Sequence, residues 1–180
     1  MSKKLLFVLG LTLLMVPRGN TQGISLGPQI GYYKAQEADK GSLMGGVAWR
    51  LKVKPIFGVE ASINYRQEKY ADDLLTVRSW PVMITGLVYP VPMIYGAVGV
   101  GWYSVTYDYN KAKLPLFKDE TTQKVGYHFG GGVELPVQTR FLLTGDIRYV
   151  FLDYDFEEIP GSGSLKSNFY VLTVGLLYKL

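Results

Sequence analysis

His128 is the only histidine in a chain of 180 residues that contains no cysteine. A histidine beside a carboxylate can act as a general base, but acyl transfer also needs a nucleophile within reach of that base. The residues that follow His128 are Phe129 and Gly130, so no nucleophile accompanies it in the sequence. The absence of cysteine also excludes thiolate nucleophiles and thiolate zinc sites. We therefore expect no catalytic residue, no metal site and no cofactor.

Charged residues inside apolar segments are a second group that could do chemistry. Together with the histidine, they are Arg50, Glu60, Arg66, His128, Glu134, Asp146 and Arg148. Charges of both signs can satisfy one another away from lipid, whereas an unpaired buried charge would be costly. We expect these side chains to form one charge network. It would act either as a plug of ion pairs, which we favour, or as a polar path for small solutes.

The segments that carry these residues alternate with a period of two, which is typical of β-strands. The alternation is clearest in residues 24–32, 57–66, 125–135 and 141–151. Noisier candidates are residues 43–53, 76–88, 94–106 and 169–180. No segment after residue 22 shows a sustained apolar stripe with the 3.6-residue period of a helix. The sequence therefore predicts an all-β fold of eight strands.

The predicted connections alternate in length, which indicates an up-and-down antiparallel order. Short links fall at Lys54–Pro55, at Tyr89–Pro92 and around Pro136–Thr139. Long polar links fall at 34–41, 67–75, 107–123 and 153–168. An eight-stranded antiparallel transmembrane β-barrel, with short periplasmic turns and four longer extracellular loops, has this arrangement.

The turn near residue 55 predicts one register of the charge network. If a turn over 54–56 pairs Val53 with Phe57, Arg50 lies directly opposite Glu60, and a cross-strand ion pair is expected. For His128 the hairpin leaves two registers open. In one register His128 faces Asp146 of the following strand, and in the next register it faces Arg148.

Side-chain size indicates which face of the sheet looks outward. One face carries glycine and a few charged residues, while the other carries valine, leucine, isoleucine, phenylalanine and tyrosine. The interior of an eight-stranded barrel is too narrow for that apolar bulk, so the apolar face must contact lipid. A soluble carrier of the lipocalin type would need the reverse. Aromatic residues near strand ends would form interfacial girdles: Tyr32, Tyr65, Trp80, Trp102, Tyr127, Tyr149, Tyr170 and Tyr178.

The N-terminus is predicted to be a secretory signal peptide over residues 1–22. Lys3 and Lys4 precede an apolar run from Leu5 to Val16, and a polar stretch follows. The run is too short for the roughly 20 residues of a membrane-spanning helix. Removing this segment takes away three basic residues and no acidic one, so the net charge falls from +4 to +1. That value gives no support to a nucleic-acid partner.

Three segments of residues 23–180 resemble the small outer-membrane β-barrel superfamily, which includes outer membrane proteins A, X and W. They are Tyr95–Trp102, Tyr127–Leu135 and the C-terminal stretch Thr173–Leu180. The last of these is similar to the family's assembly signal, through Gly175, Tyr178 and Leu180. The resemblance implies a location in the cell outer membrane, contacts with outer-membrane lipid and lipopolysaccharide, and insertion by the barrel assembly machinery.

The resemblance implies a structural or surface-interaction role for a monomer, with function carried by the loops. Loop 107–123 is the best candidate for contacting an extracellular ligand. Its relevant residues are Tyr107, Tyr109, Lys111, Lys113 and Phe117. The alternative is a narrow passive channel for small solutes. A lipid-modifying enzyme is the weaker alternative, because resemblance to the lipid A deacylases would require a serine two residues after the histidine.

Overall fold

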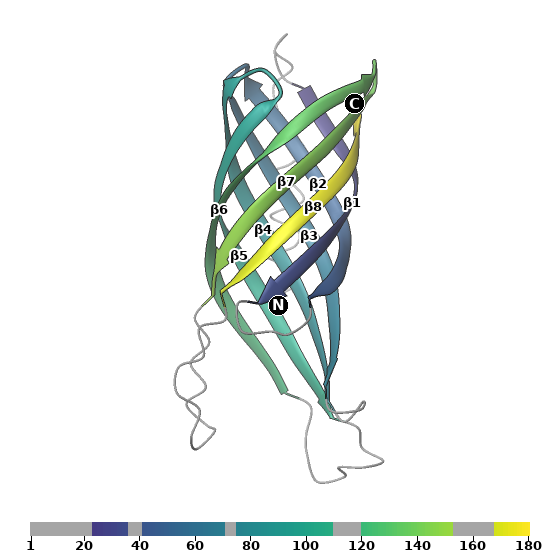
Figure 1. Cartoon of the computed structure of the whole chain (residues 1–180), viewed down its shortest axis with the longest axis vertical. Coiled ribbons are helices and arrows are strands. Elements are labelled where there is room, and N and C mark those ends of the chain that lie inside the picture. Colours follow the sequence, from purple (N-terminus) through teal and green to yellow (C-terminus); the bar gives the residue numbers. More distant parts are fainter. Residues whose placement is uncertain (1–22, 36–40, 71–74, 110–119, 153–167) are drawn as a thin grey trace, which may run out of the picture.

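The strands form a closed antiparallel barrel in which each pairs with its sequence neighbours and β1 pairs with β8 (Figure 1). The computed structural model describes residues 23–35, 41–70, 75–109, 120–152 and 168–180, so the predicted signal peptide lies outside it. The strands are β1 (Gly23–Ala35), β2 (Ser42–Lys54), β3 (Phe57–Tyr70), β4 (Leu75–Val91), β5 (Ile94–Tyr109), β6 (Glu120–Gln138), β7 (Phe141–Phe151) and β8 (Phe169–Lys179). Among the residues described, no helix is long and apolar enough to cross a membrane. The eight-stranded all-β prediction is confirmed.

The three short turns differ from the predicted links, and the second and third are tighter than predicted. Each consists of two residues, at 55–56, 92–93 and 139–140, and each follows a one-residue shift in register. Because of this shift Phe57 pairs with Lys54, so the predicted pairing of Val53 with Phe57 is wrong. Residues assigned to the links, such as Tyr89 and Pro136, belong instead to strands. Proline is tolerated at a β-bulge because a residue there need not donate a hydrogen bond to the neighbouring strand. For this reason the prolines did not mark the ends of the strands.

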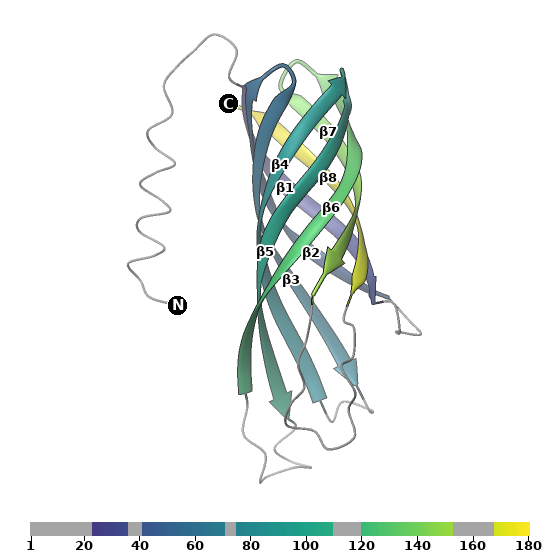
Figure 2. The ribbon, with the colours of Figure 1, turned by 90° about the vertical axis from the view of Figure 1, so that its left-hand side faces the viewer.

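Strands β3 to β6 are longer than predicted at the opposite end of the barrel. Residues 67–70, 107–109 and 120–123 were expected in loops but continue the strands. In Figure 2 this four-strand sheet extends past the neighbouring strands. These polar stretches lack apolar alternation, and backbone pairing such as Glu68 with Val77 and Thr106 with Thr121 holds them. The predicted loops are shortened to the connections at 71–74 and 110–119, which lie outside the described residues.

The two faces of the sheet are assigned as the sequence predicted. Apolar side chains such as Ile30, Val98 and Phe129 are 52–69% exposed on the outer surface, where lipid would cover them. Polar residues of the opposite parity, including Ser62 and Thr173, are buried in the lumen. Burying polar side chains and exposing apolar ones inverts the pattern of a soluble domain and is typical of a barrel in lipid.

The lumen also contains apolar side chains, which the sequence analysis did not predict. They form three clusters. Tyr33, Met44, Tyr103, Val150, Leu152, Phe169 and Val171 make up the first, which we call the aromatic layer. The other two are Leu87, Tyr89, Tyr95 and Ala97, and Ala48, Leu142 and Leu177. Leu142 and Val150, which interrupt the polar alternation of β7, therefore pack in the lumen.

Closure between β1 and β8 generates a testable prediction. Ile30 and Val174 are directly opposite across this seam and both face lipid. Opposite residues in an antiparallel pair have Cα atoms about 4.5–5.5 Å apart, which a disulfide can span. Because the chain lacks cysteine, an Ile30→Cys/Val174→Cys double variant should form one intramolecular disulfide on mild oxidation, seen as a mobility shift in non-reducing electrophoresis.

The control for this prediction moves one cysteine by two residues along the same face. Leu172 pairs with Tyr32, so Ile30→Cys/Leu172→Cys is out of register and should cross-link more slowly and incompletely. Equal cross-linking of the two variants, or none in either, would contradict the register.

Candidate functional site

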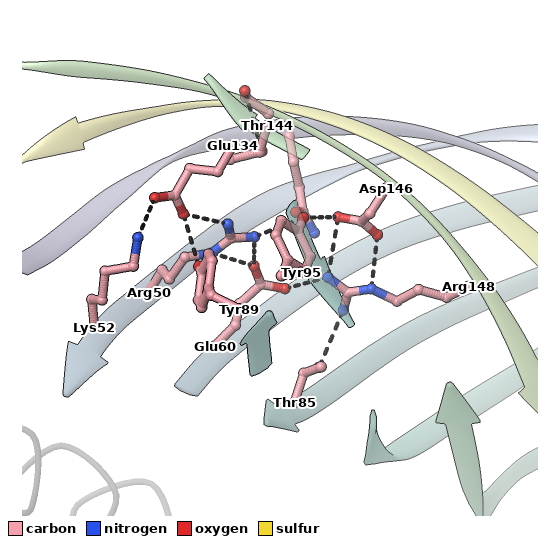
Figure 3. Close-up of polar contacts among 12 residues, drawn as sticks. Arg50, Lys52, Glu60, Thr85, Tyr89, Tyr95, Glu134, Thr144, Asp146 and Arg148 are labelled. Atoms are coloured by element: carbon pink, nitrogen blue, oxygen red, sulfur yellow. Dashed lines mark hydrogen bonds and ion pairs between the residues drawn. The ribbon is translucent and has the colours of Figure 1, made fainter. Parts of the chain in front are cut away.

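Six charged side chains meet in the lumen and balance one another. The cations are Arg50, Lys52 and Arg148, and the anions are Glu60, Glu134 and Asp146. They come from β2, β3, β6 and β7, on opposite sides of the barrel (Figure 3). We call these six residues the charge network. Three positive and three negative charges leave it formally neutral, as a group removed from water requires.

Glu60 is the centre of the charge network. Its Oε2 atom accepts hydrogen bonds from Arg50 Nε at 3.0 Å and Nη2 at 2.5 Å, and its Oε1 accepts one from Arg148 Nη2 at 2.7 Å. Arg50 lies directly opposite Glu60 on the neighbouring strand, whereas Arg148 reaches across from β7. All three side chains are at most 3% exposed. One carboxylate therefore joins two guanidinium groups from opposite walls of the lumen, as Figure 3 shows.

Two more carboxylates complete the pairing of the cations. Arg50 Nη1 donates to Glu134 Oε2 at 2.8 Å, and Lys52 Nζ donates to Glu134 Oε1 at 2.9 Å. Arg148 Nε donates to Asp146 Oδ1 at 2.8 Å. Asp146 and Arg148 are two residues apart on β7, so they share one face of the strand. Each arginine thus contacts two carboxylates in geometries that favour charge-assisted hydrogen bonds.

Two tyrosines connect the ion pairs, and the sequence analysis assigned neither to the network. The Tyr95 hydroxyl accepts from Arg50 Nη2 at 3.1 Å and donates to Asp146 Oδ2 at 2.9 Å. Tyr89 donates to Glu134 Oε2 at 2.9 Å, while its ring lies 4.0 Å from Lys52 Nζ. Tyr89 was placed in a turn because of the prolines that follow it. Alternation along the strands would have found Lys52 and Tyr95, which have the parity of the lumen face.

Glycine makes room for these large side chains at Gly132. A Cβ atom there would lie 2.4 Å from Asp146 Cβ and 2.8 Å from the Tyr95 hydroxyl. Such distances are far inside van der Waals contact, and the Gly145 carbonyl oxygen would lie only 2.5 Å away, so a larger residue would displace these side chains or the neighbouring strand. The glycine-rich sequence of β6 is therefore part of what positions the charge network.

His128 faces the lumen but does not face either predicted partner. It pairs with Val150, so the expectation that it lies opposite Asp146 or Arg148 is wrong. The turn lies at 139–140, further along the chain than the predicted link around Pro136–Thr139, which moves the partner of His128 from Asp146 or Arg148 to Val150. His128 Nε2 lies 2.8 Å from Thr85 Oγ1, which also accepts from Arg148 Nη1 at 3.1 Å. Among the described residues, this threonine provides the hydrogen-bonded link between the imidazole and the charge network.

Thr85 places its hydroxyl group beside His128. The sequence could not predict this contact, because Thr85 lies in β4, far from His128 in the chain. The two residues lie in one row across the barrel, separated by Gly99. They are 0% and 1% exposed, and both lie within the packed lumen. Among the described residues, no group of three or more acidic or histidine side chains could hold a metal ion.

Arg66 points into the lumen but stands apart from the charge network. Its guanidinium carbon lies 4.6 Å from the centre of the Tyr33 ring and 4.8 Å from that of Phe169. It forms no ion pair with a carboxylate among the side chains that the structure describes. Its position opposite Met44, near the long-connection end, places it beside the aromatic layer instead. The expectation of a single seven-residue network is therefore wrong for this residue.

The aromatic residues predicted for the interfaces lie on the outer surface. Seven of them fall in the halves of their strands nearer the long connections: Tyr32, Tyr65, Trp80, Trp102, Tyr127, Tyr149 and Tyr170. Ring contacts link several across strands, including Tyr65 with Trp80 and Tyr149 with Tyr170, each with ring centres 4.7 Å apart. Their contact with lipid headgroups stays a prediction.

The residues of the predicted assembly signal lie at the turn end of β8. Gly175 lies opposite Thr144 and Gln29, with Thr144 Oγ1 donating to its carbonyl at 3.3 Å. The Tyr178 ring packs against Phe141, and its hydroxyl accepts from Arg140 Nη1 at 2.8 Å. Leu180 is 77% exposed. Recognition by an assembly machine stays a prediction.

Residues 5–179 match the family model described as "Outer membrane protein beta-barrel domain". The chain belongs to this family. It is a protein of the outer membrane, and the inverted burial pattern agrees with that location. No curated protein sequence matches the chain.

Solved structures share the fold at low sequence identity. The attachment invasion locus protein Ail of Yersinia pestis, in complex with the heparin analogue sucrose octasulfate, is 16% identical, with 88% of this chain and 97% of Ail covered and a TM-score of 0.54. A major outer membrane protein from Thermus thermophilus is 14% identical, with coverage of 89% and 100% and a TM-score of 0.65. Outer membrane protein W of E. coli is 13% identical, with 91% of this chain and 100% of that protein covered and a TM-score of 0.55.

The charge balance of the lumen predicts the effect of neutralising Glu60. Glu60→Gln leaves each buried arginine with one carboxylate and the network with an excess positive charge. Breaking a buried ion pair typically costs about 3–5 kcal/mol. We expect a loss of that size in the free energy of unfolding, measured by urea titration of protein folded into lipid vesicles.

The matched control is Glu134→Gln, which removes the same charge nearer the turn end of the lumen. Its partner Lys52 is 32% exposed, so water can stabilise the ammonium group, and the expected loss is clearly smaller. Equal losses for the two variants, or no loss for Glu60→Gln, would contradict the central position of Glu60.

Proposed function

We propose that this protein is a closed, non-conducting outer-membrane barrel with a structural or surface-interaction role. The observation that supports the proposal is the filling of the lumen at two levels. The charge network occupies one level, and the aromatic layer occupies the other, nearer the long connections. A passive channel would need a continuous aqueous path, and an eight-stranded interior is only wide enough to be filled by side chains.

The aromatic layer is the second barrier. Its seven side chains are each at most 6% exposed and come from opposite sides of the barrel. Phe169 has its ring centre 6.2 Å from that of Tyr33 and 6.0 Å from that of Tyr103, both at edge-on angles. Edge-to-face aromatic pairs at these distances are favourable. A hydrated ion would have to disrupt this packing after passing the charge network.

A narrow channel for small solutes is the second candidate function. It is favoured by one observation, which is that a cavity at the turn end of the lumen reaches Arg50. A solute could enter there and exchange ion-pair partners on its way through the network. This alternative requires the aromatic layer to open, whereas the closed barrel does not.

Surface interaction would take place through the long connections, because binding residues are commonly found on loops that a rigid scaffold positions. Ail, which has the same fold, has been crystallised with a sulfated sugar. We propose by analogy of fold that an extracellular ligand contacts loop 107–123. Lys111, Lys113 and Phe117 of that loop lie outside the described residues, and only the backbone is described for Tyr107 and Tyr109.

We propose no enzymatic role. Thr85 and His128 are the nearest approach to a nucleophile and a base, but both are enclosed in the lumen. Lipid acyl chains lie on the other side of the barrel wall from this pair. A catalytic pair needs a position for the reacting atom beside it.

Planar bilayer recording tests the proposed function. Purified protein folded in detergent, with folding checked by heat-modifiable migration, is expected to give no discrete conductance steps because both barriers block ions. Lipid-facing Ile147→Ala should behave identically. Stable steps from the wild-type protein, changed in size by Glu60→Gln or Arg50→Gln, would contradict the closed barrel and support the channel.

A further inference from the structure

The turn end of the lumen contains two adjoining cavities of about 430 and 280 Å³. Lys52, Glu134, Leu142 and Lys179 line both, so the two spaces adjoin at these side chains. The larger cavity is framed by the turns at 55–56 and 92–93, and the smaller one extends to Arg50. Volumes of about 300–1,000 Å³ are typical of sites for small molecules.

The polar part of this mouth is positively charged. Glu134 is the only acidic residue among those that line either cavity. Its carboxylate already accepts hydrogen bonds from Arg50, Lys52 and Tyr89. Lys179 lines both cavities and forms no ion pair with any side chain that the structure describes. The mouth therefore has an ammonium group without an ion-pair partner among the described side chains, beside a carboxylate that already accepts three hydrogen bonds.

The other wall of the mouth is apolar and exposed. Ile56, Val91 and Met93 line the larger cavity and are 47–54% exposed. Pro55, Pro90, Pro92 and Pro136 continue this wall. Prolines fix the backbone and add apolar surface without a donor, so the wall offers hydrocarbon contact but few hydrogen bonds. A ligand with one anionic end and one apolar end would match the two walls.

Met93 lies on the apolar wall as the second residue of the 92–93 turn. Its φ of 74° lies in the left-handed region, and it is the only non-glycine residue with positive φ in the described part of the chain. Tight hairpin turns need positive φ at central positions, so the turn accounts for this conformation. The turn places a flexible thioether side chain on the cavity wall.

We propose that the turn-end mouth binds a small amphiphilic anion. Its carboxylate or phosphate group would lie against Lys179 and Lys52, and its hydrocarbon part against Ile56, Val91 and Met93. The ligand would reach the site from the periplasmic side, so the site exists whether or not the lumen conducts. The same chemistry is available from a dissolved anion and from the headgroup region of an anionic lipid, and the test separates these sources.

The probe is octanoate, titrated against protein in nanodiscs of neutral phosphatidylcholine. The chain has five methionines, and only Met44, Met83 and Met93 follow the predicted signal peptide. Labelling their methyl groups with ¹³C gives three signals: Met93 reports on the mouth, and the buried Met44 and Met83 report on the lumen. We expect octanoate to shift the Met93 signal saturably. Octanamide, which lacks the charge, and acetate, which lacks the chain, should each bind about tenfold more weakly.

Variants identify the ammonium group. Lys179→Gln should weaken octanoate binding about tenfold with unchanged Met44 and Met83 signals, which show that the barrel is intact. Lys54→Gln is the matched control, because Lys54 is an exposed cation of the same barrel end that lines neither cavity. It should leave binding unchanged.

The lipid source is tested by adding phosphatidylglycerol to the nanodiscs. A Met93 shift with this lipid, together with competition against octanoate, would assign the site to an anionic lipid. Octanoate binding without such competition would assign it to a dissolved anion. The proposal is overturned if octanoate gives no saturable shift, if octanamide binds as well, or if Lys179→Gln and Lys54→Gln have equal effects.

Discussion

Electrical neutrality of the charge network is the constraint on which the rest of this structure depends. Charges that are fully buried lose most of their hydration, so they must be compensated by partners of opposite sign. The charge network meets this requirement with three cations and three anions from four strands. Glu60 accepts hydrogen bonds from both arginines, so the ion pairs connect opposite walls of the barrel.

The two faces of the barrel wall divide the chemistry between them. The outer face is apolar and varied, because lipid accepts any hydrocarbon shape. The inner face must fit side chains into a fixed volume, so a large residue such as Tyr95 is matched by glycine at a position such as Gly132. The aromatic layer completes the filling toward the long connections. At the turn end the filling stops, and the cavities with Lys179 open there.

Much of this architecture could be predicted from alternation along the chain. A period of two sets the parity of each residue, and parity placed Arg50, Glu60 and Asp146 on one face. Parity does not give register, which depends on the turns. A bulge before the first tight turn places Lys54 rather than Val53 opposite Phe57. The last tight turn lies at 139–140, later than the prolines indicated, and this position sets the register of His128.

Contacts across the lumen could not be predicted from the sequence for a different reason. Arg148 meets Glu60 through space, from a strand 88 residues away. Thr85 reaches His128 in the same way, over a glycine of the strand between them. Arg66 has the predicted parity but the wrong height in the barrel, where rings rather than carboxylates surround it. Height in the barrel follows from shear and strand length, which alternation does not encode.

The most direct test of the central claim is a double-mutant cycle on Glu60 and Arg148. The free energy of unfolding from lipid vesicles would be measured for the wild type, Glu60→Gln, Arg148→Gln and the double variant. If the lumen depends on charge balance across the barrel, the double variant should be less destabilised than the two single losses combined, by about 1–3 kcal/mol. Additive losses within about 0.5 kcal/mol would contradict charge balance between Glu60 and Arg148 across the lumen.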